Sequence, residues 1–172
     1  GLPHNVSRRV RNYFDFGFPS SALPFLMQLT HGIAKERVEP EVGENVLEAL
    51  ESFFVRRALC GIEPTGLHSV FRRLWVDVQN NLSVESVRDE IDGRGTVSWP
   101  SSDLIKRSVK DRSLYGSRIS KYVIREYDRS LKGDIPSDVP WVEHILPQNP
   151  SEHWNTCFDP EELKSKVDTW AN

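Results

Sequence analysis

Apolar residues recur at helical spacing along most of the first 131 positions of the chain. The clearest stripe falls at positions i, i+3, i+4, i+7, i+8 and i+11 and consists of Leu67, Val70, Phe71, Leu74, Trp75 and Val78. A stripe of this period predicts one helix with a continuous buried face. Further stripes predict helices over residues 21–32, 44–60, 83–91, 101–114 and 118–131. The last of these is expected to bury Ile119, Tyr122, Val123 and Tyr127.

Small polar residues and glycines predict where several of these helices begin and end. The expected N-caps are hydroxyl residues that precede an apolar stripe, namely Ser20 or Ser21, Thr65 and Ser83. Acidic residues over 39–44 suit the positive end of a helix dipole, and Gly61 is the expected stop of the helix that follows. Residues 1–18 combine arginines with aromatic residues, which is compatible with a short helix leading into an aromatic anchor.

The composition changes after the last helical stripe. Residues 132–140 are rich in glycine, proline, aspartate and serine, so they predict a boundary between a helical domain at 1–133 and a second domain at 134–172. Residues 141–146 are typical of a short strand ended by Pro147, and Asp159 precedes a predicted capped helix. The expected fold class is therefore mainly α: a multi-helix domain, then a short β-strand segment and a C-terminal helix.

The bulk composition is that of an ordinary folded domain. The chain has 172 residues, 38% hydrophobic and 27% charged, with a formal net charge of -3. This charge argues against a protein devoted to wrapping nucleic acid, although a local basic patch remains compatible with it. Two distant cysteines, no signal peptide and no apolar run of membrane-spanning length indicate a cytoplasmic protein without a membrane partner. A start at Gly1 and an end at Asn172 suggest a fragment of a longer protein.

The strongest candidate for chemistry is the pair Glu143 and His144, inside the run Trp141–Asn149. An acid beside a histidine can direct a metal ligand and a general base at one phosphate. The alternative is a structural histidine beside a solvent-facing carboxylate. A zinc site using His144, His153 and Cys157 lacks a fourth ligand at standard spacing. The chain has none of the GxxxxGK[ST], GxGxxG or GxSxG motifs.

Four segments in order carry a resemblance to a known family. They are Phe54–Gly61 (FVRRALCG), Trp99–Asp103 (WPSSD), Leu114–Tyr115, and Val142–Asn149 (VEHILPQN) with Trp154. The chain resembles the region that joins the two enzymatic domains of GmrSD-like modification-dependent (type IV) restriction endonucleases, which act in phage defence. The resemblance covers most of the chain. It implies the helical middle followed by the start of a C-terminal HNH nuclease domain, also called a His-Me finger.

The resemblance also implies roles and partners. His144 would be the catalytic base, and Glu143 would stand where the family often has an aspartate that binds the metal ion. The ion would be Mg²⁺ or Mn²⁺, the substrate modified DNA, and the partner an N-terminal ParB-like nucleotide-hydrolysing domain in the same or another chain. Asn172 would open the second strand of the nuclease. The helix that carries the second metal ligand would then lie beyond Asn172, and the 172 residues alone would not cut DNA.

A second hypothesis is a helical interaction module without chemistry. In this hypothesis the Glu-His run is only an edge strand, and the arginines bind a partner protein or DNA passively. The doublets at 56–57 and 72–73 are candidates for such phosphate contacts. Doublets that follow apolar helical positions are more often solvated or ion-paired, so neither doublet is assigned to a site.

Overall fold

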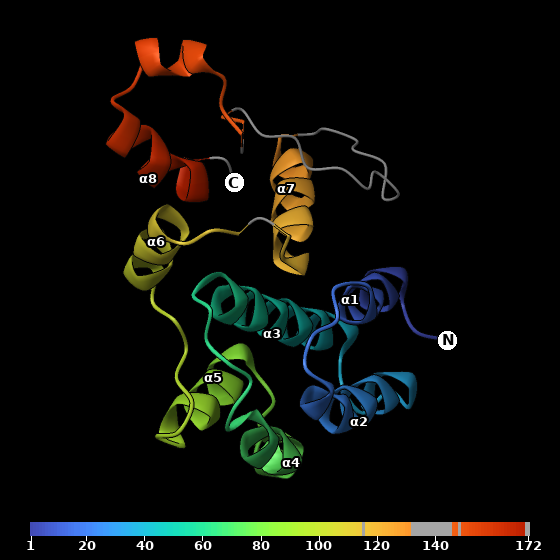
Figure 1. Ribbon diagram of the computed structural model, residues 1–172. Coiled ribbons are helices and arrows are strands. Elements are labelled where there is room, and N and C mark those ends of the chain that lie inside the picture. The colour runs from blue at the N-terminus through green and yellow to red at the C-terminus, as the bar shows by residue number, and fades with distance from the viewer. Residues whose placement is uncertain (115, 132–145, 148, 171–172) are drawn as a thin grey trace. The chain divides into compact units, whose positions relative to one another are not determined.

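The computed structural model describes residues 1–114, 116–131, 146–147 and 149–170, with side chains through residue 167. Within these ranges the chain is mainly helical, which confirms the predicted class (Figure 1). It divides into two compact units, Gly1–Ser101 and Ser102–Asn172. Residues 141–145 of the predicted strand lie outside the described residues. So does the predicted boundary between residues 133 and 134, and both therefore stay predictions.

The first unit contains five α-helices and a 3₁₀ turn within the described residues. They are α1 (His4–Asp15), η1 (Ser20–Ala22), α2 (Leu23–Ala34), α3 (Pro40–Leu59), α4 (Leu67–Val78) and α5 (Val84–Gly93). The helical elements described in the second unit are α6 (Ser102–Asp111), α7 (Arg118–Ser130), η2 (Glu152–Thr156) and α8 (Pro160–Trp170). None of the helices in the described part of the chain combines the length and the apolar composition that a membrane span requires.

Of the N-caps predicted at Ser20 or Ser21, at Thr65 and at Ser83, the one at Ser83 is confirmed. The hydroxyl of Ser83 accepts from the amide of Ser86 at 3.1 Å, and the hydroxyl of Ser86 accepts from the amide of Ser83 at 3.0 Å, a reciprocal capping box on α5. The cap predicted at Thr65 is wrong. The amide of Leu67 donates to the carbonyl of Pro64, and this turn places Gly66 at the N-cap of α4 with a φ of 86°, which favours glycine.

Two other details differ from the expectation. Ser20 and Ser21 do not cap α2, because they form the 3₁₀ turn η1 and leave Ala22 as the N-cap. On α7, Ile119 and Tyr122 are buried as predicted, but the side chain of Tyr127 is 66% exposed. Tyr127 is five residues beyond Tyr122, so it lies about 140° further around the helix and leaves the buried face.

Helix α3 lies at the centre of the first unit, where α1, α2 and α5 pack along it and α4 packs on α2 and α5 (Figure 1). Buried residues of all five helices form one apolar cluster. Its aromatic rings meet in edge-to-face and stacked pairs. The ring centroids of Phe54 and Phe71 are 5.4 Å apart in a stacked pair, and those of Phe25 and Phe71 are 6.4 Å apart in an edge-to-face pair. Such pairs each contribute about 0.5–1.5 kcal/mol beyond the burial of their area.

A buried carboxylate joins α1 to α3. Glu51 of α3 is only 2% exposed and accepts from Arg9 Nη1 at 2.8 Å and from Asn12 Nδ2 at 2.9 Å. Arg9 also pairs with Glu48 of α3 at 2.8 Å, at a more exposed position. A carboxylate in the interior is tolerated only when its oxygens accept hydrogen bonds or pair with a cation. The polar face of α1 therefore holds a specific position against α3.

We predict that Glu51→Ala lowers the free energy of unfolding by about 3 kcal/mol, because it leaves the partners of a buried pair unsatisfied. Glu48→Ala is the matched control. It removes a 60% exposed carboxylate that pairs with the same arginine, and should cost about 0.5 kcal/mol. Urea unfolding of the two variants measures the difference. Equal losses would show that the buried pair has no special role.

The close contact between α2 and α3 depends on a glycine. A Cβ atom at Gly43 of α3 would lie 2.3 Å from Ile33 Cδ1 and 2.9 Å from Ile33 Cγ1. Ile33 is buried in the core, so its side chain has little room to move. Gly93, at the end of α5, has no atom within 4 Å of the same added carbon.

We predict that Gly43→Ala destabilises the protein by about 1–3 kcal/mol through overpacking, even though alanine favours helix formation. Gly93→Ala should be neutral or stabilise it by up to about 1 kcal/mol, since only the helix propensity changes. Thermal unfolding of the two variants separates these effects. A stabilised Gly43→Ala variant would contradict the close contact.

Candidate functional site

The predicted catalytic pair lies at the edge of what the structure describes. Glu143 and His144 are outside the described residues, so their roles as metal ligand and general base stay predictions. The description resumes at Leu146, two residues after His144. What the structure contributes to this site is therefore the setting of its C-terminal flank.

Leu146 belongs to a small apolar cluster in the second unit. It is 4% exposed and packs with Leu163 of α8, with the partly buried rings of Trp154 and Phe158 against them. The rings of Trp154 and Phe158 are nearly parallel, with centroids 6.3 Å apart. Trp154, which the resemblance associates with the Glu-His run, thus packs against the cluster that contains Leu146. The cluster fixes Leu146 to η2 and α8.

Helix α8 begins as its sequence predicts. Asp159 Oδ1 accepts from the backbone amides of Glu161 at 2.9 Å and Glu162 at 3.4 Å, and Pro160 occupies the first helical position. Lys166 pairs with Glu162 at 3.3 Å, one turn along the helix. These local contacts define the start of the helix that carries Leu163.

No metal centre can be assembled from the described residues. Among them, no three His, Cys, Asp or Glu side chains lie close enough to hold an ion. His153 and Cys157, considered for zinc, are both exposed on and beside η2. The Mg²⁺ or Mn²⁺ ion implied by the resemblance thus depends on Glu143, which lies outside the described residues. Its fit to the site stays a prediction.

Two of the sequence segments that carry the resemblance meet in the first unit. Arg56 at the end of α3 donates from Nη1 to the carbonyl of Pro100 at 3.0 Å. The ring of Trp99 lies 4.9 Å from that of Phe53, and the guanidinium of Arg88 lies 5.4 Å from its centroid on the α5 side. Segments that are 44 residues apart in sequence are therefore joined by a hydrogen bond and by ring packing.

The neighbouring Arg57 is a structural cation. It is 5% exposed, donates from Nη2 to the carbonyl of Glu63 at 2.5 Å and lies over the ring of Phe53 at 5.5 Å. Burial lowers the pKa of its guanidinium, because the charged form loses hydration. An arginine nevertheless keeps its charge in a protein. Arg57 therefore fixes the turn after α3 and presents no cation to a phosphate.

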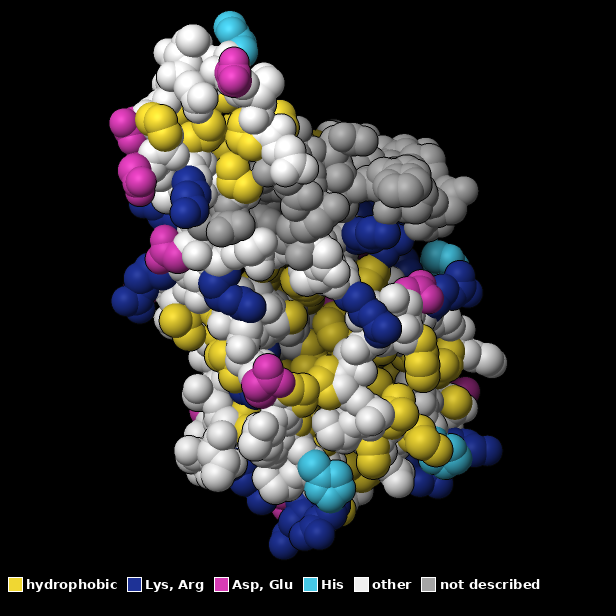
Figure 2. Space-filling model, in the orientation of Figure 1, with side chains coloured by type: hydrophobic (Ala, Val, Ile, Leu, Met, Phe, Trp, Pro, Cys, Tyr) yellow, Lys and Arg dark blue, Asp and Glu magenta, His cyan; other side chains and the backbone are white. Residues whose placement is uncertain are grey.

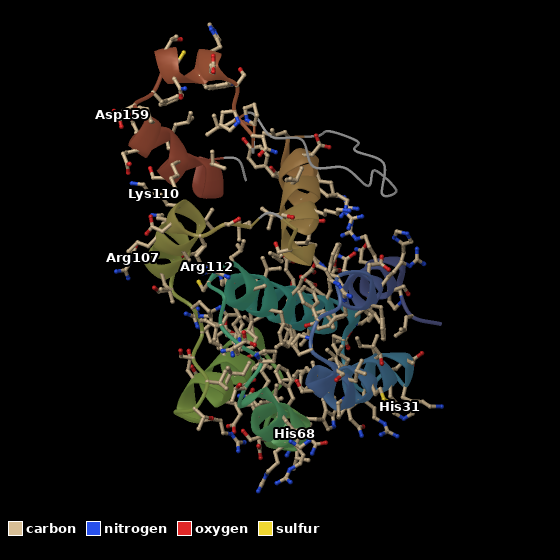
Figure 3. The ribbon with its side chains drawn as sticks, in the orientation of Figure 1. His31, His68, Arg107, Lys110, Arg112 and Asp159 are labelled. Atoms are coloured by element: carbon tan, nitrogen blue, oxygen red, sulfur yellow. The ribbon has the colours of Figure 1, made fainter. Side chains whose placement is uncertain are left out.

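Two open hollows indent the first unit. One, of about 550 Å³, lies between α3 and the start of α5 and includes Glu48, Ser52 and Glu85. The other, of about 380 Å³, is lined by Ser20, Ser21, Pro24, His68 and Arg72, and His68 projects from α4 in Figure 3. Arg73, the second member of that doublet, pairs with Asp77 at 3.8 Å. Neither hollow includes a residue predicted to be catalytic.

Positive charge is concentrated in one part of the chain that the sequence analysis did not single out. Residues 102–131 contain eight Lys and Arg and four Asp and Glu, whereas residues 1–101 contain eleven and thirteen. Four exposed cations there form no ion pair with any described residue: Arg107, Lys110, Arg118 and Lys121. We call them the four α6–α7 cations. These cations could have been found by counting charges over residues 102–131 alone, because the net charge of the whole chain is negative.

Comparison with models of protein families, with curated proteins and with solved structures finds no match for this chain.

We predict that Leu163→Ala loosens the cluster around Leu146 and raises the hydrogen-exchange rates of the α8 amides by roughly 30-fold. This factor corresponds to about 2 kcal/mol for a truncated buried leucine. Lys164→Ala, at the next and exposed position, should leave those rates nearly unchanged. Exchange measured by mass spectrometry compares the two variants. Equal rates in both would mean that Leu163 does not hold this region.

Proposed function

We propose that this chain is the helical middle and the beginning of the HNH nuclease domain of a GmrSD-like restriction endonuclease. The full-length protein would hydrolyse phosphodiester bonds of modified DNA with a divalent metal ion. One observation carries the proposal: two segments that carry the resemblance are in contact, since Arg56 donates to the carbonyl of Pro100. In the second unit, Leu146 and Trp154 belong to one small apolar cluster. These contacts support treating the residues of each set as parts of one local structure.

The proposed chemistry assigns a proton transfer to His144. Its imidazole accepts a proton from a water molecule, and the resulting hydroxide attacks the phosphorus atom. The bond from phosphorus to the leaving oxygen then breaks. A bound Mg²⁺ or Mn²⁺ ion would neutralise charge on the scissile phosphate and the leaving oxygen. Glu143 is the proposed ligand of this ion, because a carboxylate oxygen suits a hard cation.

The cellular setting and partner are part of the same proposal. Nucleotide hydrolysis would belong to a ParB-like domain of the same or a partner chain, since this chain lacks the phosphate-binding motifs. A cytoplasmic location agrees with Cys60 and Cys157, which are both free thiols.

We predict that His144→Ala in the full-length protein lowers the rate of metal-dependent DNA cleavage by about 10²–10⁴-fold, the usual contribution of a general base. His153→Ala is the matched control, because it removes an exposed histidine of the same unit and should leave the rate unchanged. Cleavage of modified plasmid DNA in Mg²⁺ and in excess chelator provides the measurement. Full activity of His144→Ala would remove this histidine from the reaction.

Glu143→Gln tests the second assignment separately. If Glu143 binds the ion, the variant should need a higher Mg²⁺ concentration for half-maximal cleavage, because the amide oxygen carries no net charge. An unchanged metal requirement would exclude Glu143 as a ligand. Absence of any metal-dependent cleavage by the wild-type protein would favour the interaction module instead.

A further inference from the structure

The four α6–α7 cations are arranged as two matched pairs. Arg107 and Lys110 are three residues apart on α6, and Arg118 and Lys121 are three residues apart on α7. Residues at this spacing lie about 60° apart around a helix and about 4.5 Å apart along its axis. Each helix therefore presents two cations on one face, and Figure 3 shows Arg107 and Lys110 projecting from α6.

These charges are not used to stabilise the fold. Lys106 lies 3.9 Å from Asp103, and Arg129 pairs with Glu126, so some cations of the two helices have local partners. The four α6–α7 cations have none among the described residues. Arg107 Nε donates to the carbonyl of Asp103 in a long bond of 3.4 Å, and the other three make no polar contact with a described residue. They remain available to an external anion.

The charge of these helix faces favours a polyanion over a protein. On α7 the exposed apolar residues Ile124, Tyr127 and Leu131 lie about 120–180° around the helix from Arg118. Ile124 is only about 60° from Lys121, so the apolar face borders the cationic one on that side. Cores of protein interfaces are enriched in aromatic residues and depleted of lysine, whereas surfaces that bind nucleic acid are polar and positively charged.

We infer that the four α6–α7 cations bind the phosphate backbone of duplex DNA, independently of base sequence. The choice of DNA as the polyanion rests on the proposed function. Duplex DNA carries one negative charge per about 1.7 Å of its axis, so two cations about 4.5 Å apart can each find a phosphate. The rest of the chain carries net negative charge and is repelled by DNA, which leaves α6 and α7 as the attracted part.

The test is fluorescence anisotropy of a labelled 24-base-pair duplex with the 172-residue chain, in EDTA and at salt concentrations from about 50 to 200 mM. Each cation that contacts a phosphate contributes about 0.9 to the slope of log affinity against log salt. The paired variants Arg107→Gln with Lys110→Gln, and Arg118→Gln with Lys121→Gln, should each make this slope shallower by about 1.8. Each pair should weaken binding by about tenfold or more at 0.1 M salt.

The control pair is Lys35→Gln with Arg37→Gln, exposed residues of the first unit that change the net charge by the same amount. It should leave the slope unchanged. Absence of binding by the wild-type chain at 50 mM salt would overturn the inference, as would equal losses in the control. Competition by polyglutamate as strong as that by unlabelled DNA would overturn the choice of DNA.

The same experiment separates this inference from the proposed function. EDTA removes divalent ions, so binding is measured without cleavage. Binding that depends on the four α6–α7 cations, in a protein whose full-length form never cleaves DNA, would retain the surface and reject the nuclease. Metal-dependent cleavage that needs His144, with DNA binding unaffected by both paired variants, would retain the nuclease and reject the surface.

Discussion

The burial of α3 is the constraint on which the first unit depends. Three helices pack along it, so residues on several of its sides are inside the protein. Two of these residues are charged, Glu51 and Arg57. A buried charge without partners would cost several kcal/mol, so other parts of the chain must reach it. Glu51 therefore determines the position of α1, and Arg57 determines the path of the chain after α3 ends.

The end of the same helix joins two segments that are far apart in the sequence. Arg56 and Phe53, on the last turns of α3, contact Pro100 and Trp99, where the first unit ends. A bond from a guanidinium to a carbonyl requires a particular backbone path, because the carbonyl must point at the end of α3. The arginine doublet and the Trp-Pro pair are thus parts of one structural junction. This role needs no phosphate contact by Arg56 or Arg57.

The helices could be predicted from sequence because burial of one helix face makes apolar residues recur with the period of the helix. Their caps were less predictable. Thr65 has the right side chain, but the turn from Pro64 to Leu67 decides where α4 begins. Tyr127 is an aromatic residue that could belong to the apolar stripe, yet its angle around α7 places it away from the buried face. The burial of Glu51 could not be read from sequence, because its partners on α1 are about 40 residues away.

For the candidate site, sequence and structure contribute different parts. The pairing of an acid with a histidine is visible in the sequence, whereas the packing of Leu146 onto α8 depends on a tertiary contact. Helix α6 differs from α3 in a way that bears on function. No residue of α6 is buried, so folding places few demands on its exposed face. Unpaired cations on that face and on α7 contribute little to stability, so folding does not require them at these positions.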